Sequence, residues 1–244
     1  MTRIGIIGAA GRMGRAIAEA IEETDAATLA GGCDEGGDGG ALARSCDVLV
    51  DFSAPAALEG NLAAAGLAGI PIVIGTTGLG AGHEALVEAA GKRIPVLRSA
   101  NMSLGVNLLA FLVREAAARL GPDWDVEILE MHHRHKVDAP SGTALLLGRA
   151  AAQGRGVDLA AVSARRRDGH TGARRPGDIG FASLRGGSVA GDHQVILAAE
   201  GERIELGHRA ESRAIFARGA VAAALWVHGK PPGLYAMADV LGLK

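Results

Sequence analysis

The sequence is short of aromatic side chains, cysteine and net charge. Only 3% of its 244 residues are aromatic, too few for the stacking platforms on which single-stranded nucleic acids bind. A formal net charge of -2 likewise disfavours a polyanionic partner, so we expect no nucleic-acid binding. Cys33 and Cys46, the only cysteines, match neither a disulfide framework nor a CxxC metal site, which fits a reducing cytoplasm.

Long apolar runs are also missing. No stretch of 18 apolar residues is present, and Met-Thr-Arg leads directly into a strand-like segment without the apolar region of a signal peptide. We therefore expect a cytoplasmic protein with no membrane partner.

Glycine, in contrast, is abundant. The 37 glycines suit an α/β protein with many tight turns between strands and helices. Strand-like and helix-like segments alternate through residues 3–97, which predicts a parallel sheet. We expect strands at 3–7, 28–33, 48–52, 71–74 and 95–97, helices after Gly14 and at 56–68 and 82–90, and a glycine-rich loop following Glu35.

The pattern changes after an amphipathic segment at 104–120, because strands then dominate. We predict an α/β fold: a Rossmann-type doubly wound parallel sheet plus an inserted α+β mixed-sheet domain. The dinucleotide-binding domain would comprise residues 1–103 and 214–244, and the substrate-binding and tetramerisation domain residues 104–213. Later elements are expected as strands at 125–131, 179–188, 194–199, 203–210 and near 239–241, and as helices beginning near Thr143 and at 215–227.

A glycine turn lies between the first strand and the first helix. Gly8, Gly11 and Gly14 form a G-x-x-G-x-x-G pattern, in which backbone N–H groups and the helix N-terminus can hold a pyrophosphate. Asp34 ends the next strand, where an acid can accept hydrogen bonds from ribose hydroxyls, and Glu35 adds a second negative charge. This pair would repel a 2′-phosphate, so we predict NADH as the preferred cofactor with NADPH possible; two solvated loop acids are the alternative.

Three further loops follow predicted strands. Ligands of open α/β sheets bind outside the carboxyl ends of the strands. Ser53, Gly75-Thr76-Thr77 and Ser99-Ala100-Asn101 are therefore candidates for a pocket.

The densest chemistry lies between Glu130 and Thr143, where three of the eight histidines fall within four positions. A zinc site is one alternative, but the run lacks HExxH, a cysteine partner and a carboxylate triad, so we expect no metal; a solvated basic loop is another alternative. Pro140-Ser141-Gly142-Thr143 precedes an apolar helical run and is typical of a helix N-terminus that binds a carboxylate. With Lys136 and a histidine nearby, the pattern predicts an anionic substrate that accepts a proton.

Several motifs together resemble the 4-hydroxy-tetrahydrodipicolinate reductase family. The resemblance covers the chain from Gly8 to about Asp239, and the HHRHKVDAPSGTA run beginning at His132 is its most discriminating part. The other matching segments are Gly8 to Gly14, Gly75-Thr-Thr-Gly78, Ser-Ala-Asn-Met-Ser-Leu-Gly-Val-Asn ending at Asn107, Gly169-His-Thr-Gly172 and Ile179-Gly-Phe-Ala182.

The resemblance implies residue roles. His132 would be the proton donor and Lys136 a second donor or charge stabiliser, while His133, Gly142 and Thr143 would bind the substrate's carboxylates. The implied cofactor contacts are Gly8, Ala9, Ala10, Gly11, Arg12, Met13, Asp34, Gly75, Thr76, Thr77, Ser99, Ala100, Asn101 and Met102.

The resemblance also implies a reaction and an assembly. A hydroxylated cyclic imine dicarboxylate loses water, the conjugated dihydrodipicolinate accepts hydride at C4 from the nicotinamide, and His132 protonates C3. The product is the tetrahydrodipicolinate of lysine and diaminopimelate biosynthesis. A homotetramer assembled through the inserted sheets, and a hinge closure, are implied too.

Two departures bear on cofactor choice: Glu35 stands where some members carry a basic residue that admits NADPH, and the stretch from Gly36 to Cys46 is short. Two alternative functions remain open. One is reduction of another small carbonyl or imine acid; the other is non-catalytic NAD sensing, which the HHRHK cluster disfavours because a sensor needs no proton donor.

One single arginine and one cluster of arginines remain. Arg213 is either a carboxylate ligand or part of a surface ion pair. A basic cluster is interpreted as a surface or subunit-contact loop: Arg165, Arg166, Arg167, Arg174 and Arg175.

Overall fold

The computed structural model describes residues 1–243, and the chain divides into two compact units. The first unit combines Met1–Leu104 with the chain from Ala214 onward, and the second is Gly105–Arg213. None of the helices in the described part of the chain is long and apolar enough to cross a membrane.

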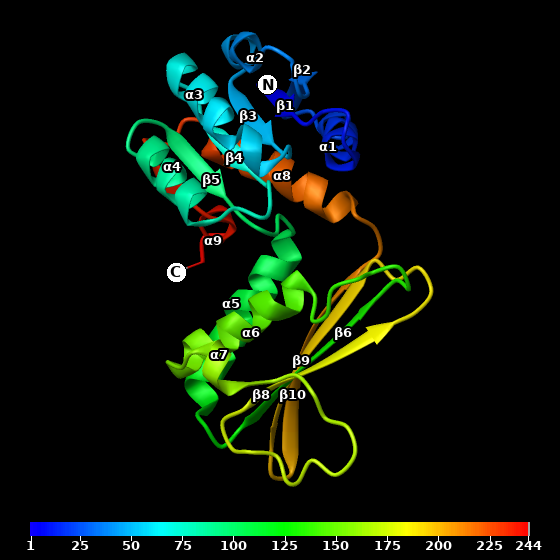
Figure 1. The fold of residues 1–244 in the computed structure, drawn as a ribbon. Coiled ribbons are helices and arrows are strands. Elements are labelled where there is room, and N and C mark those ends of the chain that lie inside the picture. Colours follow the sequence, from blue (N-terminus) through cyan, green and yellow to red (C-terminus); the bar gives the residue numbers. More distant parts are fainter. Residues whose placement is uncertain (244) are drawn as a thin grey trace. The chain divides into compact units, whose positions relative to one another are not determined.

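The first unit is built on a six-stranded, wholly parallel sheet (Figure 1). Its strand order is β11-β5-β4-β3-β1-β2. The chain adds β2 on one side of β1 and the later strands on the other side, as in Rossmann-type sheets, which confirms the predicted fold class. The strands are β1 Thr2–Ile7, β2 Ala27–Cys33, β3 Val48–Asp51, β4 Ile72–Ile74, β5 Pro95–Arg98 and β11 Gly233–Tyr235.

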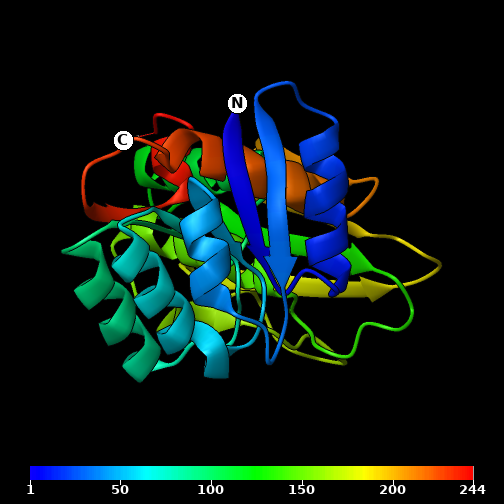
Figure 2. The ribbon, with the colours of Figure 1, turned by 90° about the horizontal axis from the view of Figure 1, so that it is seen from above.

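Helices cover both faces of this sheet (Figures 1 and 2). α1 (Arg12–Glu22), α8 (Ala214–Val227) and α9 (Met237–Val240) pack on one face. α2, α3 and α4 pack on the other. Because both faces are covered, the central strands are mostly apolar, and every residue of β3 is buried. The helices of the second face are α2 Gly39–Ser45, α3 Leu58–Ala68, preceded by the 3-10 turn Pro55–Ala57, and α4 Ala81–Gly91.

The second unit contains a mixed sheet, as predicted; it has five strands, and the short strand β7 was not expected. Its order is β10-β9-β6-β8-β7, antiparallel from β10 to β6 and parallel from β6 to β7. The strands are β6 Asp125–His132, β7 Ser163–Ala164, β8 Ile179–Arg185, β9 Gly191–Ala199 and β10 Glu202–Ala210.

Three helices cover one face of the mixed sheet: α5 (Leu104–Leu120), α6 (Gly142–Arg155) and α7 (Leu159–Val162) (Figure 1). No helix of this unit, all of which is described, covers the opposite face. β6 alternates strictly, and its buried positions end in Glu130 and His132 after two apolar residues. Alternation therefore carries two polar side chains into the layer between the sheet and the helices.

The C-terminal segment corrects one prediction. The strand expected near 239–241 is wrong: Met237–Val240 is the short helix α9, and the strand that returns to the first sheet is β11. The Asp239 carboxylate accepts the N–H of Ala236 at 2.8 Å and so closes the first turn of α9. A short apolar run fits a strand or a helix equally well, which explains the error.

Two boundaries also differ from the predictions. The glycine-rich loop contains α2, whose start is capped by Asp38 accepting the N–H of Ala41 at 2.8 Å. The strand expected at 179–188 ends at Arg185, because Gly186 and Gly187 turn the chain.

Candidate functional site

The glycine turn of the first unit brings α1 very close to β1. A Cβ atom added to Gly14 would lie 2.2 Å from the carbonyl oxygen of Gly8, and one added to Gly8 would lie 2.6 Å from that of Phe52. Gly8 also has a φ of +84°, which disfavours other residues. Gly11, the N-cap of α1, offers no capping side chain, so the first N–H groups of the helix remain available to an anion.

Two cavities flank this turn. One, of about 540 Å³, gathers the loops that follow β1, β3, β4 and β5; the other, of about 640 Å³, gathers those that follow β1, β2 and β3. The first is lined by Gly11, Arg12, Met13, Phe52, Ser53, Gly75, Thr76, Thr77, Ser99, Ala100, Asn101, Met102 and Phe216. The second is lined by Gly8, Gly11, Asp34, Glu35, Phe52, Ser53 and Asn61, among others.

These cavities bring together most of the residues that the sequence suggests for the cofactor. Ala9 and Ala10 line neither, but the N–H of Ala10 donates to both carboxylate oxygens of Asp34, at 3.0 and 3.1 Å. Asp34 is thus fixed against the glycine turn and lies beside Glu35 at the second cavity. These features fit a dinucleotide. The uncapped helix start and the glycine backbone suit the pyrophosphate, and the two acids suit the ribose hydroxyls.

Sequence reasoning missed the group beneath these loops. Asp51 is fully buried, and its Oδ1 accepts the N–H of Ser53 at 2.9 Å, the Ser53 hydroxyl at 2.6 Å and the Thr76 hydroxyl at 3.1 Å. It therefore ties the loop after β3 to the loop after β4. A carboxylate ending an otherwise apolar strand was the available signal. The cavity-lining rings of Phe52 and Phe216 gave no comparable pattern.

In the second unit, His132 occupies the end of β6 and is 9% exposed. Its Nδ1 lies 2.5 Å from Oε2 of Glu130, and its ring meets that of His193 edge-on at 5.1 Å. Burial alone would raise the pKa of Glu130, but hydrogen bonds, first from Arg185 and then from His132 and Ser183, outweigh it and lower this pKa. Glu130 is therefore a buried carboxylate beside the proposed proton donor.

The predicted helix start is confirmed next to this pair. α6 begins at Gly142 and Thr143 and is capped by Ser141, whose hydroxyl accepts the N–H of Ala144 at 3.1 Å. The N–H of Ser141 donates to Oε1 of Glu130 at 3.2 Å, so the helix start adjoins the His132 pair. Within the described chain the N–H of Gly142 has no hydrogen-bond partner, as an anion site requires.

The loop between β6 and α6 carries the remaining candidates. Nζ of Lys136 pairs with Asp138 at 2.7 Å, and the backbone N–H of His133 donates to Val189 at 2.8 Å. Desolvation, followed by the nearby positive charge of Arg213, lowers the pKa of His133. Arg213, a weaker candidate from the sequence, thus lies near enough to act on the same loop.

His193 had no assigned role from the sequence. It is 5% exposed on β9, and its Nε2 lies 3.1 Å from the Ser141 hydroxyl. Desolvation first, then the charge of His132, lowers the pKa of His193 to about 4. The ring is consequently neutral near pH 7. Only the pairing of β9 with β6 brings it to the site.

Three arginines of the basic cluster pair with carboxylates of the second unit. Arg167 and Arg174 bind Glu127, and Arg175 binds Asp178. The described residues contain no group of three or more histidine, cysteine, aspartate or glutamate side chains placed to hold a metal ion.

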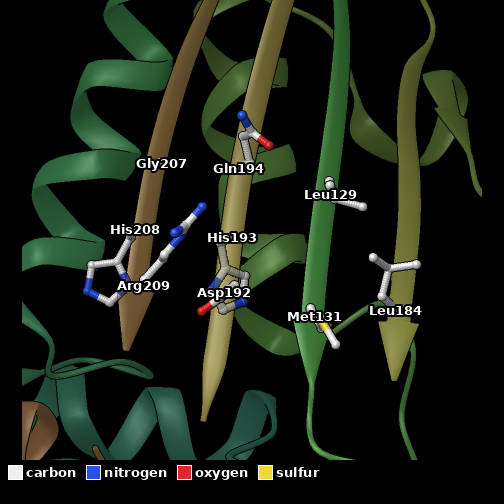
Figure 3. A pocket seen from close by; sticks show the side chains of 9 residues that line it. All are labelled: Leu129, Met131, Leu184, Asp192, His193, Gln194, Gly207, His208 and Arg209. Carbon is white, nitrogen blue, oxygen red and sulfur yellow. The ribbon is translucent and has the colours of Figure 1, made fainter. Parts of the chain in front are cut away.

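The face of the mixed sheet also has a cavity, of about 390 Å³ (Figure 3). Figure 3 shows Leu129 and Met131 on β6 beside Leu184 on β8, with residues of β9 and β10 along the other side. Leu184 is 48% exposed. The cavity therefore presents an apolar strip next to polar side chains.

Two family models together match nearly the whole chain. The one described as dihydrodipicolinate reductase, N-terminus, matches residues 2–102, and the one described as dihydrodipicolinate reductase, C-terminus, matches residues 105–241.

Curated relatives match over the same length. A protein of Zymomonas mobilis named 4-hydroxy-tetrahydrodipicolinate reductase is 60% identical over 99% of this chain and 97% of its own. A protein of the same name from Parvibaculum lavamentivorans is 56% identical over 99% and 98%. Among solved structures, a dipicolinate-bound dihydrodipicolinate reductase from a Paenisporosarcina species is similar with a TM-score of 0.77, at 23% identity and over 98% of both chains. At that identity the structural likeness supports the fold.

Proposed function

The chain belongs to the dihydrodipicolinate reductase family, and we propose that it reduces the ring formed by dehydration of 4-hydroxy-tetrahydrodipicolinate to tetrahydrodipicolinate. As a member of this family it is an oxidoreductase that uses a nicotinamide cofactor. The observation that carries the proposal is the 60% identity, over almost the whole of both chains, to a relative that bears this activity in its name. The product belongs to lysine and diaminopimelate biosynthesis, as inferred from the family.

The first unit would hold the cofactor. Gly8 to Met13 with Asp34 would bind the dinucleotide, and the loops at Gly75 to Thr77 and Ser99 to Met102 would bind the nicotinamide end. When bound, the cofactor supplies the hydride. Asp34 and Glu35 support NADH as the preferred donor with NADPH possible, because two acids at the cavity oppose a 2′-phosphate.

The second unit would hold the substrate. The N-terminus of α6 at Gly142 and Thr143, with His133, would bind the carboxylates of the ring, because helix N–H groups favour anions. His132 would donate the proton, and Lys136 would be a second donor or stabilise developing charge. Glu130, His193 and Arg185 surround His132 and support this assignment, since a buried and anchored imidazole suits directed proton transfer.

We further propose a homotetramer assembled through the mixed sheets, and a cytoplasmic location. The apolar strip of Leu129, Met131 and the exposed Leu184 supports the homotetramer, because contiguous apolar surface marks subunit contacts. Cys33 and Cys46 are free thiols, which is consistent with a reducing compartment.

The test is to follow NADH absorbance with the enzymatically generated hydroxylated imine. We expect NADH oxidation, a higher kcat/KM with NADH than with NADPH, and a large loss of turnover in His132→Gln with NADH affinity retained. Dinucleotide binding without oxidation would favour the sensing alternative. Oxidation only with another carbonyl or imine acid would favour the other one.

A further inference from the structure

Glu130 is a buried carboxylate whose two oxygens are both saturated with hydrogen bonds. It is 1% exposed and lies two positions before His132 on β6. Oε2 meets Nδ1 of His132 at 2.5 Å and accepts from Arg185 at 2.9 Å; Oε1 accepts from Arg185 at 2.9 Å and from the N–H of Ser141 at 3.2 Å. One carboxylate thus touches the proposed proton donor and the start of α6 together.

Strand register places the guanidinium that holds this carboxylate. β6 pairs in parallel with β8, and Arg185 lies opposite His132 in that pairing. Two guanidinium nitrogens of Arg185 donate hydrogen bonds to Glu130, and Arg185 also donates to the carbonyl oxygen of Asp138 at 2.7 Å. A two-pronged contact of this kind fixes both the position and the angle of a carboxylate. Glu130 therefore has little freedom to turn away from the ring.

The rest of the His132 ring is arranged to leave Nε2 open. The ring of His193 packs edge-on against it, and Nε2 makes no hydrogen bond within the second unit, which is described throughout. A Cβ atom at position 191 would lie 3.0 Å from Nε2, so Gly191 keeps a side chain away from that atom. One ring nitrogen is anchored and the other is left for a ligand.

We propose that Glu130 is the positioning residue for proton donation by His132. By accepting the Nδ1–H it orients the ring, makes Nε2 the atom that releases the proton, and holds this atom in register with the start of α6. The idea rests on the proposed function for its kinetic consequence. The predicted orientation and tautomer of the His132 ring do not depend on that function.

His132 donates one proton to the substrate and then regains one from solvent. The hydrogen on Nε2 of the protonated ring bonds to the substrate carbon, and the electrons of the broken N–H bond stay on Nε2. His132 is then neutral with its hydrogen on Nδ1, which Glu130 keeps, and solvent returns a proton to Nε2. Removal of the anchor allows the ring to carry its hydrogen on the wrong nitrogen or to rotate.

The first experiment needs no substrate. Nitrogen-15 spectra of the wild-type chain with labelled histidine distinguish the two neutral tautomers, and the spectrum of His132→Gln assigns the signal. We expect neutral His132 to carry its hydrogen on Nδ1. A hydrogen on Nε2 overturns the proposal, whether or not the chain reduces the cyclic imine.

The second experiment is kinetic. In Glu130→Gln we expect a kcat about 10- to 100-fold below wild type, as when a metal-binding histidine loses the partner that orients its ring, with the KM for NADH unchanged. Glu115→Gln makes the same chemical change on an ion-paired glutamate of α5 and should alter neither value. A wild-type kcat in Glu130→Gln overturns the proposal. If wild type itself fails to oxidise NADH, the proposed function fails, and the tautomer still decides the positioning role. The tautomer is measured on the wild-type chain, so this measurement tests the proposal even when Glu130→Gln does not fold.

Discussion

His193 shows how burial can assign a charge state to a single side chain. Its ring lies between β9 and α6 with its Nε2 near the Ser141 hydroxyl, and desolvation lowers its pKa to about 4. In the unfolded chain a histidine has a pKa of about 6.5. Between these two values the unfolded state binds more protons than the folded state, so acid favours unfolding. The charged or titratable groups that act on His193 are His132, Glu130, His208 and Lys136.

The consequence is a pH-dependent stability. The contribution of His193 is complete above about pH 6.5 and is lost as the pH falls to about 4, a difference of about 3 kcal/mol. We expect His193→Gln to flatten the fall in the free energy of unfolding over this range, as measured by urea titration at one protein concentration. The exposed His170 serves as the control, because His170→Gln should leave the slope as in wild type. Parallel profiles for wild type and His193→Gln would contradict this prediction.

At the same scale, the sequence located some site residues and could not locate others. The HHRHK run and the Pro-Ser-Gly-Thr helix start are local patterns, so His132 and the start of α6 could be found without a structure. Arg185 and His193 come to the site only through the pairing of β8 and β9 with β6. Register between distant strands is set by packing and turns, which no local motif contains.

At the scale of elements, the glycines that join β1 to α1 are a packing requirement. A Cβ atom at Gly14 would meet the Gly8 carbonyl oxygen at 2.2 Å, whereas one at Gly66, in α3, would meet nothing within 4 Å. Gly14→Ala must displace α1 from β1, at a cost of about 1–3 kcal/mol. Gly66→Ala should instead stabilise by about 0.5–1 kcal/mol, since it removes a helical glycine.

Thermal unfolding and NADH titration check this pair. We expect a lower Tm and weaker NADH binding in Gly14→Ala, and a slightly higher Tm with unchanged binding in Gly66→Ala. Equal changes of Tm and NADH binding in Gly14→Ala and Gly66→Ala would show that the glycine turn is not needed for the close approach of α1 to β1.

Elements with strong periodicity were predicted best. The amphipathic segment at 104–120 is the helix α5, and the strand expected at 125–131 is β6. Short elements are harder to predict: the sequence near 239–241 suggests a strand where the structure has α9, and the glycine-rich segment after Glu35 gives no sign of α2. In α2 the buried Leu42 and Ala43 pack against the sheet, and that tertiary contact outweighs the low helix propensity of glycine.

At the scale of the whole molecule, the mixed sheet has one face that its own unit leaves without helices. Leu129, Met131 and Leu184 form the apolar strip there and line the cavity of Figure 3. A closed symmetric assembly uses the same surface on each copy, so a substitution within it enters every such interface twice. The proposed homotetramer should therefore be unusually sensitive to a charge in this strip.

Leu184→Asp tests that sensitivity. Leu184 is 48% exposed in the single chain, so the aspartate is solvated there and the fold should survive, as judged by an unchanged circular dichroism spectrum. Within an interface, by contrast, an unpaired carboxylate loses its water and also removes the contact that the leucine made. We expect sedimentation velocity to report a tetramer for wild type and a smaller species for Leu184→Asp. Leu67→Asp should remain tetrameric, because Leu67 is 88% exposed on α3 of the first unit, outside the strip. A monomeric wild type would refute the assembly itself, and a tetrameric Leu184→Asp would place the interface on another surface.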